Sequence, residues 1–337
     1  MKPGTVVEIN GDMTLTAYWA IEEFEMRGFD DEWHGYNLLC RVTSRSPDEV
    51  EIKGCLSIDD GCAIVIPATV ENNRIPYSVT SIREEVFNSV YELTSISIPA
   101  SMRSIGENAF ENCRNLATVT LHSNPTIGGG AFPDGATVTM TLPANPANGA
   151  YWTTFYNNLF KFQADENTKV YKATVSGTEL TLHEVEDKIV DSGTAVILKS
   201  SGNPVMTLTT SGGEWSANDL WGCNERTLCS DILTGSLAGG TIYVMGKPEG
   251  KEMGFYEYTG EYMPANKAFI ALEPSTSEAP TRGLSFVEEE TTNIEDVTTD
   301  NSQQTTDTWY TLSGVKLTGK PTTKGVYLYN GHKYIVE

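Results

Sequence analysis

Two consecutive stretches of the chain carry the same pattern. Residues 79–98 read VTSIREEVFNSVYELTSISI, and residues 102–121 read MRSIGENAFENCRNLATVTL. Five apolar positions of the first stretch return after 23 residues in every case: Ile82, Phe87, Leu93, Ile96 and Ile98 recur as Ile105, Phe110, Leu116, Val119 and Leu121. A fixed step of this length predicts a solenoid, because a single short strand and turn cannot bury their apolar face until neighbouring units stack on them.

The repeat extends in both directions from these two copies. A degraded third copy follows, and an incomplete copy precedes them; their apolar residues are Ile127, Phe132, Val138, Met140 and Leu142 after the pair, and Ile64 and Ile66 before it. We therefore expect three to four repeats near residues 60–143. Inward-pointing residues of successive parallel strands should be Ile96 and Ile98, Val119 and Leu121, and Met140 and Leu142. Phe87, Phe110 and Phe132 should stack inside, and Cys113 should be a structural buried thiol.

One of these copies resembles a known family. Residues Ser104 to Leu121 fit the string S-I-G-E-N-A-F-x-N-C-x-x-L-x-x-V-T-L, which resembles the repeat of BspA-like leucine-rich-repeat surface proteins of Bacteroides-group bacteria. The preceding copy departs from it at Arg83 and Val86, where the string has Gly and Ala. The resemblance covers about a quarter of the chain. It implies a cell-surface location, adhesion or binding to host or matrix proteins, and no shared catalytic residues.

Residues between the inward positions of the repeats should face outward. They form a predicted ladder of hydroxyl side chains made by Ser95, Ser97, Thr118, Thr120, Thr139 and Thr141. Repeat proteins often bind partners through such a face, so these six residues are the candidate binding site. The alternative is that hydroxyl and β-branched residues are present only because they suit an exposed sheet.

The segment before the repeats is predicted to form a cap. Leu38, Cys40 and Val42 alternate, residues 46–48 form a turn, and Val50 and Ile52 return, which predicts a hairpin over residues 36–56. Such a hairpin would cover the first repeat, and we place the cap and repeats together at 36–144. Residues 4–19 resemble the closing strands of a β-grasp-type repeat of bacterial surface proteins. We therefore interpret residues 1–35 as the fragment of a surface repeat, cut from a longer protein.

A second domain is predicted over residues 150–288, after a linker rich in Pro, Asn and Gly. Eight short β-branched or aromatic segments indicate a β-sandwich-like or jelly-roll-like fold: 170–175, 179–185, 194–199, 205–210, 241–245, 254–258, 268–272 and 284–288. The aromatic group around residues 151–160 is expected in its core. The fold class is thus mainly β: a short leucine-rich-repeat solenoid, then this domain, then a small C-terminal β-hairpin module.

That module is predicted over residues 308–337, behind a polar linker at 289–307. Trp309 to Leu312 should turn at Ser313-Gly314 into Val315 to Leu317, and residues 325–329 should turn at Asn330-Gly331 into 333–336, since Asn-Gly is a strong hairpin signal. The tail resembles a C-terminal module of many secreted Bacteroides-group proteins, which implies export or surface retention.

Composition limits the possible functions. The net charge is −22, with 45 acidic and 23 basic residues, so binding to nucleic acid or to an anionic membrane is not expected. The four histidines are far apart, the six cysteines form no C-x-x-C pair, and no G-x-S-x-G motif occurs. We predict no enzyme activity, no metal site and no cofactor. Cys223 with Cys229, or Cys40 with Cys55, could approach each other, but six unpaired thiols are the simpler expectation.

Three functions stay open at this point. The first is a non-catalytic, extracellular or cell-surface adhesion protein that binds a host or matrix protein, as a monomer and without a membrane span. The second is a carbohydrate-binding or glycosidase-accessory module in residues 150–288, which exposed Trp152, Trp215 and Trp221 would favour. The third is a structural spacer that projects the repeats.

Overall fold

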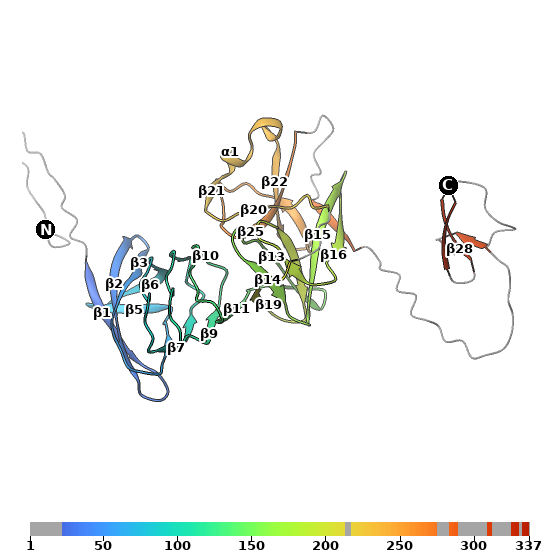
Figure 1. The fold of residues 1–337 in the computed structure, drawn as a ribbon. Coiled ribbons are helices and arrows are strands. Elements are labelled where there is room, and N and C mark those ends of the chain that lie inside the picture. The colour runs from blue at the N-terminus through green and yellow to red at the C-terminus, as the bar shows by residue number, and fades with distance from the viewer. Residues whose placement is uncertain are drawn as a thin grey trace, which may run out of the picture. The chain divides into compact units, whose positions relative to one another are not determined.

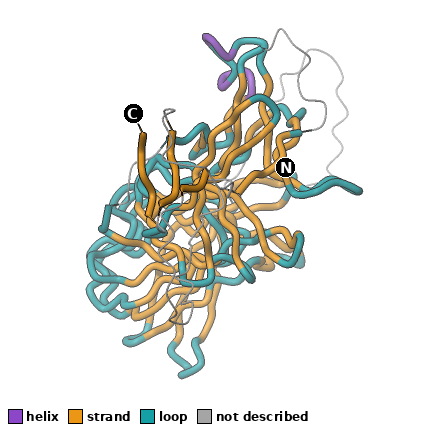
Figure 2. The backbone as a smooth tube through the Cα atoms, turned by 90° about the vertical axis from the view of Figure 1, so that its right-hand side faces the viewer, coloured by secondary structure: helices purple, strands orange, loops and turns teal. Residues whose placement is uncertain are grey.

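The computed structural model describes residues 22–212, 217–274, 283–288, 309–311, 325–329 and 332–336. It is a mainly β protein, as predicted, and divides into two compact units, residues 1–289 and 290–337. Figure 2 shows strands through most of the backbone, with helix confined to one excursion. The predicted N-terminal fragment lies largely outside the described residues, and the predicted domain boundaries stay predictions.

The N-terminal cap is the hairpin that the sequence predicts. β2 (Gly35–Arg45) pairs with β3 (Asp48–Ile58), and β1 (Glu23–Phe29) is added to the free edge of β2. Leu38, Cys40, Val50 and Ile52 are fully buried against the first repeat. β3 also pairs in parallel with β6 (Ile75–Ile82), so backbone hydrogen bonds as well as side-chain packing join the cap to the solenoid.

The solenoid has two sheets of short parallel strands (Figure 1). One sheet contains β6, β8 (Ser104–Ile105) and β10 (Thr126–Ile127), with β5 (Thr69–Asn72) paired antiparallel to β6. The other contains β4 (Cys62–Val65), β7 (Leu93–Ile98), β9 (Thr118–Leu121) and β11 (Thr137–Thr141). The parallel pairing confirms the predicted stacking of repeats.

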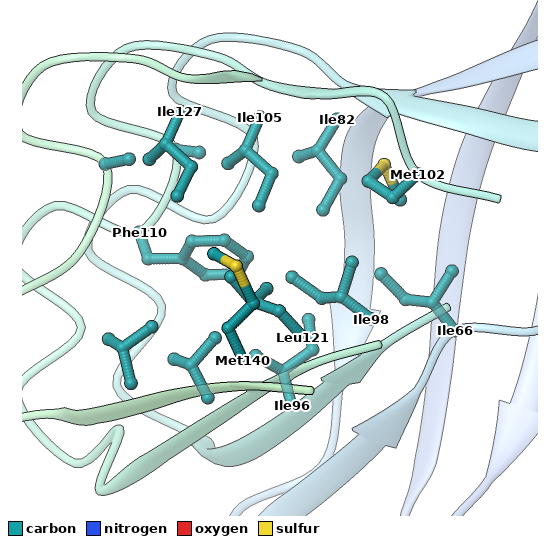
Figure 3. Close-up of a cluster of buried hydrophobic side chains, with 14 of the residues drawn as sticks. Ile66, Ile82, Ile96, Ile98, Met102, Ile105, Phe110, Leu121, Ile127 and Met140 are labelled. Carbon is teal, nitrogen blue, oxygen red and sulfur yellow. The ribbon is translucent and has the colours of Figure 1, made fainter. Parts of the chain in front are cut away.

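The core between these sheets is built from equivalent residues of successive repeats. Ile82, Ile105 and Ile127 lie in one row in Figure 3, on the opposite side of the core from Ile96, Leu121 and Met140. The predicted phenylalanine column is also present. The ring centroids of Phe87 and Phe110 are 4.9 Å apart, and those of Phe110 and Phe132 are 5.9 Å apart, with nearly parallel planes in both pairs.

The register of the third repeat differs from the predicted one. Val138 lies beside Val119, and Met140 lies beside Leu121, so the inward pair aligned with Val119 and Leu121 is Val138 and Met140. Leu142 is buried but follows the strand. The step from Val119 to Val138 is 19 residues, four fewer than the 23 of the preceding repeats and two fewer than the predicted alignment requires. A shift by an even number of residues keeps the same side chains inward, so the hydrophobic alternation alone does not reveal it.

The second solenoid sheet does not end at β11. β19 (Val205–Thr209) pairs antiparallel with β11, and β14 (Lys161–Ala164) and β17 (Ile189–Val190) extend the sheet to seven strands. The segment 205–210 was expected in the β-sandwich, but its strand belongs to the solenoid sheet instead. It pairs there because Met206 is buried directly beside Met140, which closes the end of the repeat core.

The other seven predicted strands of residues 150–288 lie in a sheet of ten strands. One half contains β12 (Asn145–Ala147), β13 (Ala150–Phe155), β18 (Val196–Ser200), β15 (Thr168–Ser176) and β16 (Glu179–Glu184). The other half contains β26 (Leu284–Glu288), β23 (Gly254–Glu257), β22 (Thr241–Gly246), β25 (Lys267–Leu272) and β20 (Trp221–Cys223). The two halves enclose a core that includes Trp152, Tyr171, Phe255 and Ile270.

Of the aromatic group at residues 151–160, Trp152 and Phe155 are buried as predicted, whereas Tyr151 is 36% exposed.

A small excursion lies outside the ten-stranded sheet. It contains β21 (Thr227–Leu228), which pairs with β24 (Tyr262–Met263). Two short helical turns follow β21 in the chain, α1 (Cys229–Ile232) and η1 (Gly235–Leu237).

The unit of residues 290–337 contains a three-stranded antiparallel sheet. β27 (Trp309–Thr311) pairs with β28 (Gly325–Tyr329), which forms the predicted hairpin with β29 (His332–Val336). The predicted return strand at residues 315–317 lies outside the described residues.

Candidate functional site

The outward side of the seven-stranded sheet carries two rows of aligned residues, which we call the ladder face. The first row runs across the strands through Ser95, Thr118 and Thr137. The second row runs through Ser97, Thr120, Thr139 and Thr207. Each of these residues alternates along its strand with a buried core residue, so its side chain stands on the opposite side of the sheet.

All six residues predicted for the binding ladder lie on this face, but their partners differ from the predicted ones. Thr139 lies beside Thr120 and not beside Thr118, and Thr137 takes the position that the sequence pattern gave to Thr139. Thr141 pairs with Val205 of β19. Thr118 is exposed, and the other five are partly exposed.

Sequence reasoning missed the residues that extend the ladder face beyond the repeats. At one end Val65 aligns with Ser97 and is 61% exposed. At the other end Thr207 aligns with Thr139, and Gln163 aligns with Thr207. The alternation in residues 205–209 identifies a strand, but nothing in the sequence says which sheet the strand joins.

The ladder face is almost free of charge. Among the outward residues of the described strands β4, β7, β9, β11, β19 and β14, the charged one is Lys161, whose amine lies 3.0 Å from the carboxylate of Asp191. His122 lies at the border, with its Nε2 3.1 Å from Ser97 Oγ. In a chain of net charge −22, this face is therefore a flat area that an uncharged or acidic partner can approach without facing carboxylates on the strands.

A separate cleft of about 860 Å³ lies between the solenoid and the segment that contains β24. The solenoid contributes Met102, Arg103, Ser104, Asn124 and Thr126 to its lining. The opposite wall contains Glu225, Arg226, Tyr258, Glu261, Tyr262, Pro264, Ala265 and Asn266. A cleft of this size is in the range of small-molecule sites.

The two walls of the cleft are joined by side-chain amides. Asn266 Nδ2 donates to Asn124 O at 3.1 Å, and Asn124 Nδ2 donates to Asn266 O at 3.2 Å. Thr126 Oγ1 donates to the carbonyl of Asn224 at 2.6 Å. Asn266 is 3% exposed and has a positive φ of 58°, so the surrounding structure holds it in a conformation that an isolated residue seldom adopts. The walls are thus fixed relative to each other.

The cysteines do not form a reactive site. All six are unpaired, as the simpler expectation had it, and neither Cys40 with Cys55 nor Cys223 with Cys229 is bonded. Burial raises the pKa of Cys40 to about 12 and the pKa of Cys113 to about 11. Since the thiolate is the nucleophile, these buried thiols have a structural role, and Cys113 Sγ contacts the carbonyl oxygen of Phe87 at 2.8 Å.

Two of the histidines have local hydrogen-bonding partners. His34 Nδ1 lies 3.0 Å from Asp30 Oδ2, and His183 Nε2 lies 2.7 Å from Thr174 Oγ1. Within the described residues no group of three or more His, Cys, Asp or Glu side chains is placed to hold a metal ion. No helix in that part of the chain is long and apolar enough to span a membrane.

The fold and the repeated rows define a leucine-rich-repeat protein. Residues 68–180 match the family model described as the BspA type leucine rich repeat region, with 6 copies, so the chain carries a repeat region of the BspA type. Three to four repeats were expected. The matched residues extend beyond the parallel strands of the solenoid, which end at Thr141. They include β12, β13, β15 and the start of β16 in the ten-stranded sheet, and β14 in the solenoid sheet.

Two solved structures are similar to parts of the chain. A leucine-rich cell surface protein from Faecalibacterium prausnitzii is 30% identical over 31% of this chain and 26% of its own, with a TM-score of 0.22. A leucine-rich repeat protein from Bacteroides ovatus is 24% identical over 36% of this chain and 37% of its own, also with a TM-score of 0.22. The similarity thus covers well under half of either protein. The comparison with curated proteins finds no match.

Proposed function

We propose that this chain is part of a non-catalytic cell-surface or secreted protein that binds a host or matrix protein through the ladder face. The observation that carries the proposal is the continuity of the second row, from Ser97 through Thr120 and Thr139 to Thr207. Four strands from two parts of the chain present hydroxyl groups in register on one flat face. A BspA-type repeat region supports the same assignment.

The composition of the ladder face supports a protein partner. Hydroxyl and methyl groups of aligned threonines give a surface that is both apolar and capable of hydrogen bonding, as interface cores are. Carboxylates, which are depleted at the centre of protein interfaces, are missing from the described outward strand positions although the chain has 45 acidic residues. The spacer alternative gives no reason for this separation of charge.

The partner-binding proposal is tested by placing a charge at the centre of the ladder face. The Thr120→Lys and Thr139→Lys variants should lose affinity for the partner by at least about tenfold, since each buries an unpaired ammonium group in the interface. Binding is measured by surface plasmon resonance on an array of purified extracellular-matrix proteins. Ser81→Lys, on the outward side of the other solenoid sheet, is the matched control and should bind as the unsubstituted chain does.

Equal binding of all three variants would contradict the ladder face as the binding surface. Deleting residues 60–143 is a poorer experiment, because β19 and Met206 of the second part then lose the strand and core on which they pack. The surface location is tested separately, by labelling intact cells of the source organism with an antibody against this chain. Labelling that requires lysis of the cells would contradict it.

A further inference from the structure

We infer that the cleft between the solenoid and β24 is a second binding site, which takes a short neutral oligosaccharide. This site uses none of the residues of the ladder face, and so it is independent of the protein-binding function proposed above. The walls of the cleft face each other at a fixed separation.

The cleft is preorganised for a ligand. The Asn124–Asn266 amide pair and the hydrogen bond from Thr126 to Asn224 link the walls at the base of the cleft. The backbone N–H of Asn266 donates to the carbonyl of Cys223 at 2.7 Å, which ties the outer wall to β20. A ligand that enters therefore loses little free energy to ordering the protein, and weak individual contacts are enough for binding.

One wall of the cleft carries aromatic rings and a guanidinium group. The guanidinium carbon of Arg226 lies 3.8 Å from the centre of the Tyr262 ring, and Tyr258 donates its hydroxyl hydrogen to the carbonyl of Tyr262 at 2.7 Å. These contacts hold a planar cation and two phenol rings in one wall. Flat aromatic and guanidinium surfaces pack against the C–H faces of pyranose rings, while their edges accept or donate hydrogen bonds to ring hydroxyls.

The charged residues that line the cleft balance each other. Arg103 and Arg226 are balanced by Glu225 and Glu261, so the charged residues of the lining sum to zero in a chain of net charge −22. Arg103 is further engaged by Glu49, with 2.8 Å between guanidinium nitrogen and carboxylate oxygen. An anionic ligand would face two carboxylates, and a basic peptide would face two guanidinium groups. A neutral polyol meets both kinds of group as hydrogen-bond partners.

The planar polar side chains fit vicinal hydroxyl groups in particular. A guanidinium group donates two parallel hydrogen bonds, and a carboxylate accepts two, which matches the spacing of adjacent sugar hydroxyls. Ser104 and Thr126 add single hydroxyl groups from the solenoid wall. A peptide would instead be favoured by a deep apolar pocket, and the lining contains no large aliphatic cluster. Thr126 belongs to β10, the end strand of its sheet, so tetrapeptide probes test the peptide alternative directly.

The experiment is a titration of the whole chain by isothermal calorimetry with three sets of probes. These are neutral tetrasaccharides of glucose, mannose, galactose and N-acetylglucosamine, anionic tetrasaccharides of galacturonic acid, and tetrapeptides of mixed composition. We expect binding of at least one neutral tetrasaccharide and a rise of the unfolding midpoint in its presence, because a ligand that binds only the folded state stabilises it.

Two substitutions locate the site. Tyr262→Ala and Arg226→Met should each weaken binding of that tetrasaccharide by about tenfold, a change of about 1.4 kcal/mol. Tyr91→Ala is the matched control, since Arg114 lies over the Tyr91 ring in the same kind of cation–π pair on the solenoid surface, away from the cleft. Arg226 is exposed, so the Arg226→Met variant should fold and report on binding even if Tyr262→Ala fails to fold.

The inference is overturned if no neutral tetrasaccharide binds, if anionic sugars or peptides bind more tightly, or if Tyr91→Ala weakens binding as much as the cleft variants. The outcome of this experiment can be distinguished from the outcome of the ladder-face experiment. Thr120→Lys and Thr139→Lys should leave tetrasaccharide binding unchanged, and the cleft variants should leave binding to matrix proteins unchanged.

Discussion

Single residues decide how closely two repeats can stack, and Gly106 is the clearest case. A Cβ atom at this position would lie 2.3 Å from the backbone nitrogen of Glu84 in the preceding repeat. Gly128 approaches Glu107 in the same way one repeat later, at 2.5 Å. The corresponding residue of the first copy is Arg83, whose neighbour is the cap strand β3 and not another repeat turn. The departure of this copy from the repeat string thus has a steric reason.

Substitution of Gly106 by Ala should destabilise the protein by about 1–3 kcal/mol, because the turns of adjacent repeats must move apart to admit the methyl group. Gly129→Ala is the control, since nothing lies within 4 Å of a Cβ atom at that position. The measurement is the free energy of unfolding in guanidinium chloride. Equal stability of the two variants would show that the repeats tolerate a wider spacing.

At the scale of elements, the edge strand β4 is protected by the cap. Asp30 Oδ2 accepts the backbone N–H of Ala63 at 3.0 Å, and the hydroxyl of Tyr36 donates to the carbonyl of Val65 at 3.0 Å. These are polar groups that an open sheet edge would offer to another strand. Asp30 also accepts the backbone N–H groups of Glu32 and His34, so one carboxylate shapes the turn and covers the edge.

The Asp30 contacts predict a pH-dependent stability. The hydrogen bond from Ala63, followed by those from His34 and Glu32, lowers the pKa of Asp30 to about 2, and the hydrogen bond to Asp30 raises the pKa of His34. A lowered carboxylate pKa stabilises the fold above its unfolded value of about 3.9, and this stabilisation is lost as the pH falls through about 2. A raised His pKa stabilises the fold below about 6.5 and is lost as the pH rises through the folded value.

The stability difference between the unsubstituted chain and Asp30→Ala should therefore be largest between about pH 4 and 6.5 and smaller on either side. Urea midpoints measured from pH 2 to 9 test this. His34→Gln should remove the decline on the alkaline side and leave the acid side in place. A difference that does not vary with pH would mean that the Asp30 contacts are not formed in solution.

At the scale of the whole molecule, the solenoid and the second part share one sheet and one core. The larger hydrophobic cluster extends from Met26 in the cap, through Phe110 in the repeats, to Phe162 and Met206 in the second part. Terminal repeats need a cover for their open core, and here a hairpin covers one end while β19 covers the other. The described part of residues 22–288 should therefore unfold as one cooperative unit.

Met206→Ala tests this coupling. The side chain is fully buried beside Met140, so its truncation should cost about 2–5 kcal/mol. Hydrogen exchange measured by mass spectrometry should show the loss of protection in peptides of residues 93–121 as well as in those of residues 150–200. Loss confined to residues 150–200 would show that the two parts unfold separately.

Much of the fold follows from the local pattern. The step of 23 residues identified the stacked strands, the phenylalanine column and the buried Cys113, because each depends on residues that recur at fixed spacing. Alternation and turn residues located the cap hairpin, the eight later strands and the Asn330-Gly331 hairpin. The outward side of the six ladder residues follows from the same alternation.

How these strands pair with one another depends on the tertiary structure. The shift that puts Thr137 beside Thr118 depends on the length of one turn, and the transfer of β19 to the solenoid sheet depends on how Met206 fills the end of the repeat core. Arg103 and Arg226 both line the cleft, although they are more than a hundred positions apart in the sequence. The repeat and the residues that each strand buries can be predicted from the amino-acid order, since local spacing sets them. Which strands pair, and which residues face each other across the cleft, cannot be predicted in this way, because those contacts depend on how distant segments pack.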